Sequence, residues 1–236
     1  MKTAWLVLLV FTCLRCFAEP RPLRPGPDEP PLALASTNPP IREIESGVFQ
    51  LGTVLLNKSE RAVTIPAVIN MTQGPIEYLL VHETGKIHES VLRTAAEPLH
   101  VHLAWLLLQS QRTAPTGNTN QGQAARDLHG PAATLSVTWT NASGAKSFAA
   151  EALVFNSSTA SPMSRGPWIC NGSRVIEGTF LAQRDGSIVS VITDPDALIN
   201  SLRPGRDRDD IWFTNTNTVP PINSPVTVTI RFLESK

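Results

Sequence analysis

The sequence predicts an α+β fold that is strand-rich, with mainly antiparallel sheets, one buried helix and one short helix. Short runs of β-branched and apolar residues recur along most of the chain, and polar or glycine-containing turns separate them, as in antiparallel strand pairs. Only residues 97–110 and 194–202 have helical patterns. Strands and helices do not alternate regularly, which argues against a parallel doubly wound sheet.

Residues 1–18 have the layout of a secretory signal peptide, which is removed on export. Lys2 supplies the positive charge, and the apolar run that follows is too short to span a bilayer as a helix. We expect cleavage between Ala18 and Glu19. A lipoprotein signal and an uncleaved anchor are the alternatives. The sequence therefore predicts a periplasmic or extracellular protein without a membrane span in the mature chain.

Residues 19–40 are rich in proline, which fixes φ and has no N–H to donate. We expect this segment to be an extended, disordered linker. A single domain is predicted to follow over residues 41–236, and a chain that is 42% hydrophobic has enough apolar residues for a core. Once the leader is removed, Cys170 is the only cysteine, so no disulfide can form within the chain.

The first predicted strands of the domain lie at residues 47–57 and 61–70, on either side of a polar turn. Both runs are rich in β-branched residues and are short enough to be strands. Pro66 interrupts the second run. Because proline cannot donate to a strand ladder, we expect this strand to lie at a sheet edge or to carry a bulge.

Residues 78–92 are predicted to form a hairpin, because two apolar runs surround a Thr-Gly pair. The hairpin carries two His-Glu dipeptides, which begin at His82 and His88. Neither of the two possible turn positions places both histidines on one face, and only one of them pairs His82 with Glu89. A shift of one residue decides between them, because it moves every side chain of a strand to the other face.

Residues 97–110 are predicted to form a helix. Pro98 suits the first turn, and leucines follow at helical spacing, at positions 99, 103, 106 and 107. The remaining residues make the segment apolar on nearly every side, so we expect the helix to be buried. His100 lies in the first turn, and it points too far from His102 for the two to chelate one ion.

The second half of the chain repeats the pattern of strands after a long polar loop at residues 112–131. A short helix is predicted at 194–202, because Asp194 suits the N-cap and Pro195 suits the first helical position. The remaining predicted strands lie at residues 133–140, 145–155, 178–183, 187–193 and 224–234.

The sequence lacks the common motifs of several functional classes. Its 20 basic and 20 acidic residues balance, so no basic excess indicates a nucleic-acid partner. It has no glycine-rich phosphate loop, no dinucleotide fingerprint and no G-x-S-x-G motif. The His88-Glu89 dipeptide is not followed by the second histidine of a zinc protease. We therefore predict no cofactor, and we interpret Cys170 as a buried structural thiol.

The candidates for a polar or binding site are His82, His88, Glu89 and His100. Imidazole and carboxylate groups can bind zinc, but a zinc site needs about three or four converging ligands. His88, Glu89 and His100 are the candidate metal ligands, because the helix follows the hairpin closely. The alternative is that these side chains face water or satisfy nearby backbone groups, and the sequence leaves both interpretations open.

Several stretches, in order along residues 47–231, together resemble the YdjY-like domain family of exported bacterial proteins. They include "GKIHESVL", "EPLHVHLAWLLL" and "GTFLAQRDGSIVSVITDPDALI". The resemblance implies an exported, single-domain protein, and the family has no established activity to carry over. Some relatives are labelled ferredoxin-like, but an iron-sulfur cluster needs several cysteines, and only Cys170 follows the leader.

The function that these observations favour is a non-enzymatic module at the cell envelope that binds a small ligand or an envelope partner. The hairpin and the start of the helix would supply its polar site. The main alternative is a metal-dependent or acid-base enzyme that uses His88, Glu89 and His100. A structural module associated with the cell wall is a third possibility.

Overall fold

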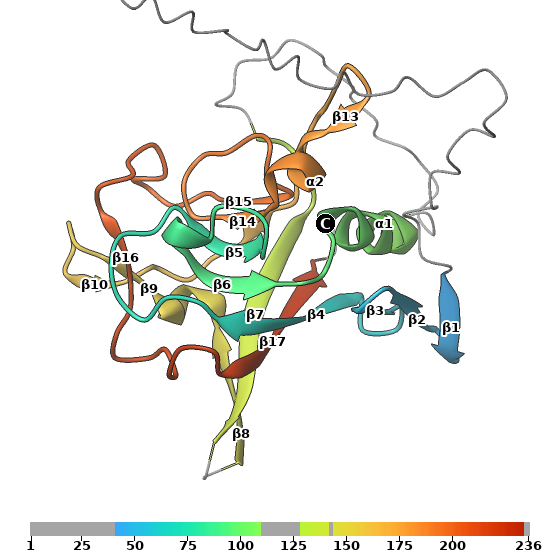
Figure 1. Cartoon of the computed structure of the whole chain (residues 1–236), viewed down its shortest axis with the longest axis horizontal. Helices are drawn as coiled ribbons and strands as arrows, with labels where there is room; N and C mark the ends of the chain where they lie inside the picture. The colour runs from blue at the N-terminus through green and yellow to red at the C-terminus, as the bar shows by residue number, and fades with distance from the viewer. Residues whose placement is uncertain (1–40, 110–127, 142–143, 234–236) are drawn as a thin grey trace, which may run out of the picture. The chain divides into compact units, whose positions relative to one another are not determined.

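The computed structural model describes residues 41–109, 128–141 and 144–233 (Figure 1). The predicted signal peptide with its cleavage site, the predicted linker and most of the loop expected after the first helix lie outside the described residues. The helices are α1 (Pro98–Gln109) and α2 (Leu181–Asp185), with 3-10 turns at Ile87–Glu89 and Ala150–Leu153. The strands are β1 (Arg42–Glu45), β2 (Val48–Leu51), β3 (Val54–Asn57), β4 (Ala62–Ile69), β5 (Tyr78–His82), β6 (Ser90–Thr94), β7 (Ala132–Asn141), β8 (Gly144–Ala149), β9 (Val154–Asn156), β10 (Ser161–Pro162), β11 (Trp168–Ile169), β12 (Val175–Ile176), β13 (Thr179–Phe180), β14 (Ser187–Ser190), β15 (Ile199–Ser201), β16 (Trp212–Thr214) and β17 (Pro225–Phe232).

Most strands belong to one large mixed sheet, in the order β1-β2-β3-β4-β17-β7-β11-β15-β14-β5-β6, with β8 paired to β7. β6, the last strand in this order, also pairs with β4, so the sheet closes on itself at this point. Its neighbouring strands are antiparallel except in the pairs β5–β6 and β14–β15. Two small antiparallel sheets, β10-β9-β16 and β12-β13, complete the strands of the described residues. A strand-rich fold with mainly antiparallel pairing is therefore confirmed.

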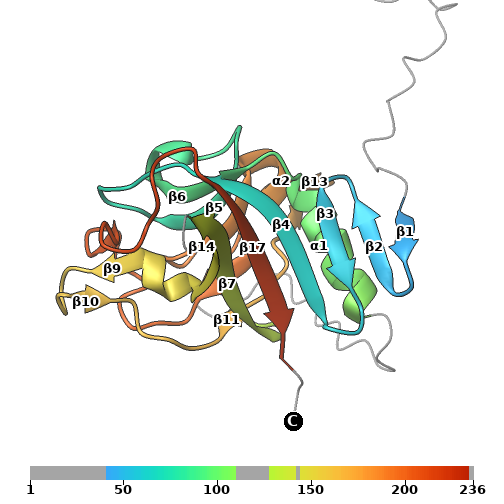
Figure 2. The ribbon, with the colours of Figure 1, turned by 90° about the horizontal axis from the view of Figure 1, so that it is seen from below.

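The centre of the large sheet separates a core face from an open face. Along β4, β17 and β7, buried residues alternate with more exposed ones, as expected for a sheet with one face covered. The side chains that face the core include Val63, Ile65, Val137, Val228 and Ile230, all fully buried. α1 packs against β3 and β4, and Figure 2 shows it behind these strands.

The helix predicted at 97–110 is confirmed as α1, but the leucine stripe does not form its buried face. Val101, Ala104 and Leu108 face the core, whereas Leu106 is 42% exposed. Because the segment is apolar on nearly every side, the sequence pattern could predict the helix but not its orientation.

The short helix predicted at 194–202 is wrong: residues 195–198 form a turn and a bend, and β15 follows them. The side chain of Asn200 explains the difference, because its Oδ1 accepts the Asp194 N–H at 2.7 Å and its Nδ2 donates to the Asp194 carbonyl at 2.7 Å. Asp194 in turn accepts the Asp196 N–H, an Asx turn that competes with a helix start. The short helix is α2, which begins within the strand predicted at 178–183; only Thr179–Phe180 of that range form a strand, β13.

The hairpin predicted at 78–92 is also wrong, because β5 and β6 pair in parallel. Every residue of β5 is buried, and the strand lies between β6 and β14. Strands buried on both faces are typical of parallel pairing, and their apolar runs do not reveal strand direction. Residues 83–89 bring the chain back along the strand. Gly85 allows this return, since a Cβ there would lie 2.8 Å from the Asp185 carbonyl oxygen.

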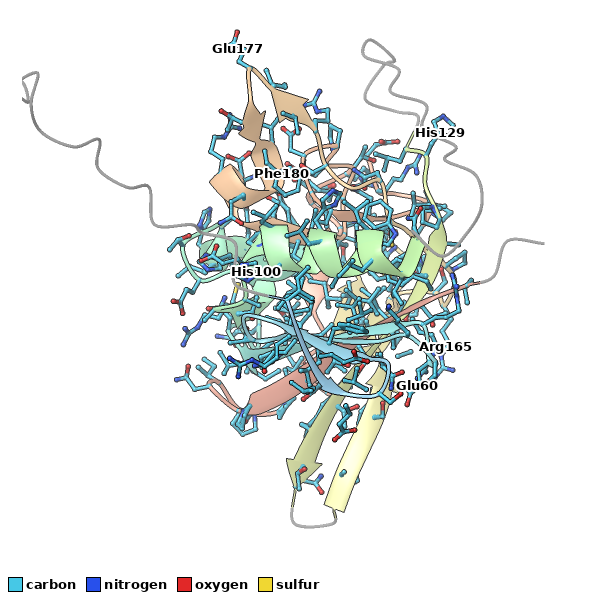
Figure 3. The ribbon with its side chains drawn as sticks, turned by 90° about the vertical axis from the view of Figure 1, so that its right-hand side faces the viewer. Glu60, His100, His129, Arg165, Glu177 and Phe180 are labelled. Carbon is cyan, nitrogen blue, oxygen red and sulfur yellow. The ribbon has the colours of Figure 1, made fainter. Side chains whose placement is uncertain are left out.

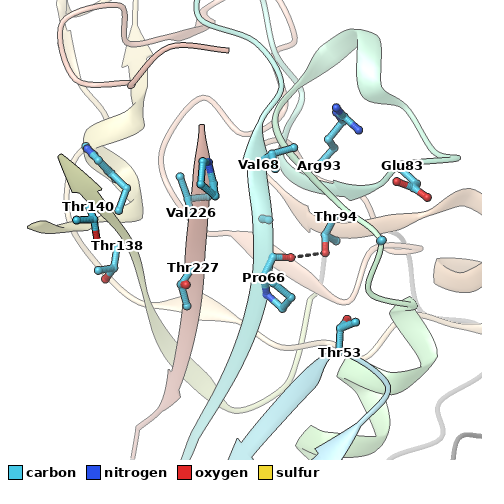
Figure 4. A pocket seen from close by; sticks show the side chains of 14 residues that line it. Thr53, Pro66, Val68, Glu83, Arg93, Thr94, Thr138, Thr140, Val226 and Thr227 are labelled. Carbon is cyan, nitrogen blue, oxygen red and sulfur yellow. Dashed lines mark hydrogen bonds between the residues drawn. The ribbon is translucent and has the colours of Figure 1, made fainter. Parts of the chain in front are cut away.

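Pro66 lies where the large sheet forks. On one side β4 pairs with β17 along nearly its whole length and without a register shift at Pro66, so the prediction of an edge strand or a bulge is wrong for this pairing. On its other side β4 pairs with β3 as far as Thr64 and with β6 from Val68 onward. Pro66 falls between these pairings, and its carbonyl accepts a hydrogen bond from the Thr94 hydroxyl at 2.5 Å (Figure 4). Proline therefore occupies the position that needs no N–H donor.

Candidate functional site

A groove of about 640 Å³ lies over the fork, on the open face of β4, β17 and β7 (Figure 4). Its floor is set by strand register: Thr227 pairs with Pro66 on one side and with Thr138 on the other. Two residues along, Pro225 pairs with Val68. Because alternate residues of a strand share a face, these side chains form two rows that cross the sheet.

The second row of the floor ends at a charged residue. Pro225 pairs with Val68 of β4, and Val68 pairs with Arg93 of β6. Glu83, Thr94 and Ala95 continue this wall of the groove, and Thr53 lines another part of it. Figure 4 shows Glu83 and Arg93 on the same side of the groove. The groove therefore combines a floor of hydroxyl and small apolar groups with two opposite charges at one end.

No aromatic ring faces the groove from its floor. Trp139 is among the lining residues, but it is only 8% exposed. Its ring faces the side of β7 opposite Thr138 and Thr140, and it stacks on Phe148 with the ring centroids 4.5 Å apart. The groove thus offers a ligand hydroxyls, aliphatic groups and the charges of Arg93 and Glu83, without a stacking platform.

Parallel pairing separates the two His-Glu dipeptides of the sequence. Glu89 directly precedes β6 and lies beside the start of β5, where its carbonyl accepts the Glu77 N–H at 2.9 Å. His82 ends β5, and the next residue, Glu83, donates its N–H to the Thr94 carbonyl at 2.8 Å. Opposite ends of a five-residue strand are roughly 13 Å apart. The structure therefore does not bring His82 together with His88 and Glu89.

His82 is buried and belongs to a network of polar side chains at the start of α1. Its Nδ1 lies 2.8 Å from the Thr84 hydroxyl, and its Nε2 lies 3.8 Å from a carboxylate oxygen of Glu97. The other oxygen of Glu97 accepts a hydrogen bond from Gln183, whose own side-chain oxygen accepts the Leu99 N–H at 3.0 Å. This network of polar side chains links the end of β5 to α1 and α2.

His88 and Glu89 lie near the surface. The His88 side chain is 76% exposed, and its Nε2 is 3.6 Å from Glu89. Glu89 is also 3.9 Å from Lys86, whose ammonium donates to the buried Tyr78 hydroxyl. Burial, and then the negative charge of Asp194, raise the pKa of Tyr78. Both hydrogen-bonding positions of this phenol are used inside the protein, since it donates to Asp194.

His100 is buried against the turn between β2 and β3. A Cβ on Gly52 would lie only 2.6 Å from His100 Nδ1. Figure 3 places His100 on the side of α1 that faces these strands. Within residues 41–109, 128–141 and 144–233, no group of three His, Cys, Asp or Glu residues could hold a metal ion. The candidate ligands His88, Glu89 and His100 therefore do not converge in this structure.

Two further observations concern the predicted role of Cys170 and the lengths of the helices. Cys170 is 1% exposed, and burial raises the pKa of its thiol, which fits the predicted structural role. In the part of the chain that the structure describes, no helix is long and apolar enough to cross a membrane.

Sequence patterns alone do not reveal the groove residues. Thr138, Thr140 and Thr227 have the alternation of a solvent-exposed strand face, and that is how the sequence presents them. Arg93 is an isolated charge in an apolar run, and Glu83 belongs to the first His-Glu dipeptide, with nothing in the sequence that connects the two. Their grouping depends on the pairing of strands that are more than 60 residues apart in the sequence, namely β4, β7 and β17.

Comparison with known protein families gives a match over most of the described domain. The family model described as YdjY domain matches residues 54–231, the range that contains the groove and all four candidate site residues. No curated protein and no solved structure matches the chain.

Proposed function

The chain belongs to the YdjY domain family. On that premise, we propose that this domain is a binding module, which holds an extended segment of a partner polypeptide in the groove over β4, β17 and β7. The observation that carries the proposal is the groove itself. Its volume of about 640 Å³ lies within the range of roughly 300–1,000 Å³ that is usual for ligand sites. It is open to solvent along one side, as a site for an extended chain must be.

The dimensions of the floor suit a short stretch of extended polypeptide. From β7 across β17 and β4 to Arg93 of β6 there are three strand spacings, roughly 14 Å. An extended chain covers that distance with about four residues. Threonine hydroxyls can donate and accept hydrogen bonds, so Thr140 and Thr227 can pair with both the N–H and the C=O groups of such a chain. The hydroxyl of Thr138 donates to Ser147 and can accept an N–H.

The chemistry of the lining favours a polypeptide over a sugar or a nucleobase. Proteins bind nucleobases largely by stacking them on aromatic rings, and aromatic faces are also common in ligand pockets. The single ring among the lining residues, Trp139, is turned to the other side of its strand. Pro66, Pro225 and Val68 instead supply small aliphatic surfaces between the hydroxyls.

A peptide-display experiment tests the proposal. A random heptapeptide library is selected against the immobilised full chain, and the recovered peptides are measured by fluorescence anisotropy. Thr227→Trp, which fills the middle of the floor, is expected to weaken binding at least tenfold. Thr229→Trp is the matched control, because Thr229 lies on the same face of β17 but does not line the groove. Peptides that bind both variants as well as the wild type would overturn the proposal, and so would a selection without enrichment.

The module is proposed to act outside the cytoplasm. The charge of Lys2, the apolar run after it and the small residues before Glu19 support export. Mass spectrometry of the protein recovered from the periplasmic or extracellular fraction tests this. An N-terminus at Glu19 is the expected result, whereas a chain that keeps Met1 and stays in the cytoplasm would contradict export.

A further inference from the structure

Arg93 is placed at the end of the groove with most of its hydrogen-bonding capacity unused. It is partly buried between the neighbours of β6, pairing with Val81 of β5 and Val68 of β4. Its Nη2 donates to Asn223 Oδ1 at 3.0 Å. A guanidinium has five N–H donors, and the other donors of Arg93 have no acceptor among the described residues. The side chain is therefore held in place but not saturated.

Among the described residues, no carboxylate lies within ion-pair distance of Arg93, and the same holds for Arg42, Arg61 and Arg165. Five other arginines do form an ion pair with a carboxylate, namely Arg174, Arg184, Arg203, Arg208 and Arg231. Glu83 lines the same wall of the groove but lies beyond ion-pair distance of Arg93. Its hydrogen-bond partner is the neutral amide of Asn223, which orients the guanidinium without neutralising it.

Asn223 is fixed so that it can orient Arg93. Its φ of +65° is in the left-handed region, which asparagine tolerates better than most residues. Its N–H donates to the Ile69 carbonyl at 2.8 Å, which ties the loop before β17 to the end of β4. The side-chain oxygen is thereby held beside β6. Asn223 is an exposed turn residue, and asparagine commonly adopts this conformation in turns, so the turn sets the position of its side chain.

We propose that Arg93, oriented by Asn223, binds a carboxylate group of the polypeptide segment in the groove. A planar carboxylate matches the fork of a guanidinium and can accept two parallel hydrogen bonds from it. Glu83 on the same wall disfavours a ligand with several negative charges and can accept an N–H from the same segment. The carboxylate comes from an acidic side chain or from the C-terminus of the partner. This inference rests on the proposed function.

Four pools of fluorescent heptapeptides test the assignment on the full chain. The pools are random except at one feature: a central Glu with an amidated C-terminus, a central Gln with a free C-terminus, a central Gln with an amidated C-terminus, and a central Lys with an amidated C-terminus. Charge-assisted hydrogen bonds contribute about 1.5–3 kcal/mol, so a pool with the preferred carboxylate should bind at least about tenfold more tightly than the Gln amide pool. The first two pools distinguish a side chain from a C-terminus as the source.

Variants then assign the effect to residues. Arg93→Gln is expected to reduce the affinity for the preferred pool to that of the Gln amide pool, and Arg93→Lys should restore only part of it. Asn223→Gly keeps the left-handed backbone but removes the acceptor, so an intermediate loss is expected. Arg231→Gln is the control, because Arg231 is a β17 arginine that pairs with Glu60 and does not line the groove. Thermal unfolding of each variant confirms that it is folded.

The results separate the two proposals. Binding that is lost in Thr227→Trp but is indifferent to the carboxylate or to Arg93→Gln would overturn the role of Arg93 and leave the groove as the binding site. If no pool binds, or if binding survives Thr227→Trp, both proposals are overturned. Preferential binding of the Lys pool would likewise reject Arg93 as the anchor, since it would assign recognition to Glu83.

Discussion

Arg203 donates a hydrogen bond to Glu151 in the interior of the domain, where each side chain is only 5% exposed. The same carboxylate oxygen accepts the indole N–H of Trp168 at 3.0 Å, and the guanidinium of Arg203 lies 4.6 Å from the Trp168 ring centroid. Arg203 also donates to the carbonyls of Ser164, Gly166 and Pro167. The pair therefore has many compensating hydrogen bonds and fixes the segment before β11.

The first prediction is that Glu151→Gln destabilises the protein by about 3–5 kcal/mol, because it leaves the buried charge of Arg203 without a counterion. Burial already lowers the pKa of Arg203, and Glu151 opposes that shift. Urea unfolding followed by tryptophan fluorescence measures the change. Glu60→Gln is the control, since it breaks an ion pair with Arg231 in which both side chains are more than half exposed. It should cost at most about 1 kcal/mol. Equal losses in the two variants would contradict the prediction.

Alternation of apolar and polar residues predicted the centre of the sheet correctly. β7 and β17 lie within or close to the ranges expected for them, and α1 lies within one residue of its expected ends. These elements are long, and their periodicity results from one covered face. The short, fully buried strand β5 has no such signal, and its direction relative to β6 could not be predicted.

The candidate site was harder to predict than the fold, because its residues come together only through pairing of distant strands. The His-Glu dipeptides drew attention because they repeat within a few residues, but β5 and β6 place them at opposite ends of a strand. Arg93 and Asn223 are 130 residues apart, and their contact depends on the fork at Pro66. No local pattern in the sequence carries that information.

The second prediction concerns the close contact between Gly172 and the aromatic side chains of α1. Gly172 has a φ of +79°, and a Cβ there would lie 2.6 Å from Cζ3 of Trp105 and 3.2 Å from Cε1 of His102. Gly172→Ala should therefore cost about 1–2 kcal/mol for the backbone conformation and about 1–3 kcal/mol more for overpacking. Chemical denaturation at pH 7 measures the loss.

Gly178→Ala separates these two contributions. Gly178 has a nearly identical φ of +77°, but nothing lies within 4 Å of a Cβ at this position. It belongs to the turn between β12 and β13, next to Glu177, on the side of α1 away from β2 and β3 (Figure 3). Only the backbone cost should remain in this variant. If both alanine variants lose the same stability, Trp105 does not pack against Gly172 as the structure has it.

The third prediction is a loss of stability at acid pH that depends on His102. Burial lowers the pKa of His102 from 6.5 to about 4, and its ring contacts Trp105 and Phe180 rather than a charged group. Below pH 6.5 the unfolded chain binds a proton that the folded chain does not bind. The free energy of unfolding should therefore fall as the pH drops from 6.5 to about 4, by up to about 3 kcal/mol.

His102→Phe isolates this contribution from the other titrating groups. Urea unfolding of the wild type and the variant at pH 7.0 and pH 4.5 gives two differences in stability. The wild type should lose more than the variant between these pH values, because phenylalanine does not titrate. Parallel pH profiles for the two proteins would show that His102 titrates normally in the folded state.

The fourth prediction concerns the hydroxyl that supports the fork of the sheet. Thr94 is 3% exposed, and its Oγ1 donates to the Pro66 carbonyl and accepts the Ala96 N–H at 3.0 Å. Thr94→Val keeps the shape of the side chain but leaves both backbone groups without this partner, so we expect a loss of about 1–3 kcal/mol in the free energy of unfolding.

Thr138→Val is the control, because it makes the same chemical change at another residue of the groove. The hydroxyl of Thr138 bonds Ser147 at the surface, so this variant should cost less than about 0.5 kcal/mol. The comparison therefore measures the fork and not the loss of a threonine from the groove. Equal stability of the two variants would show that the Pro66 carbonyl and the Ala96 N–H do not depend on the Thr94 hydroxyl for a partner.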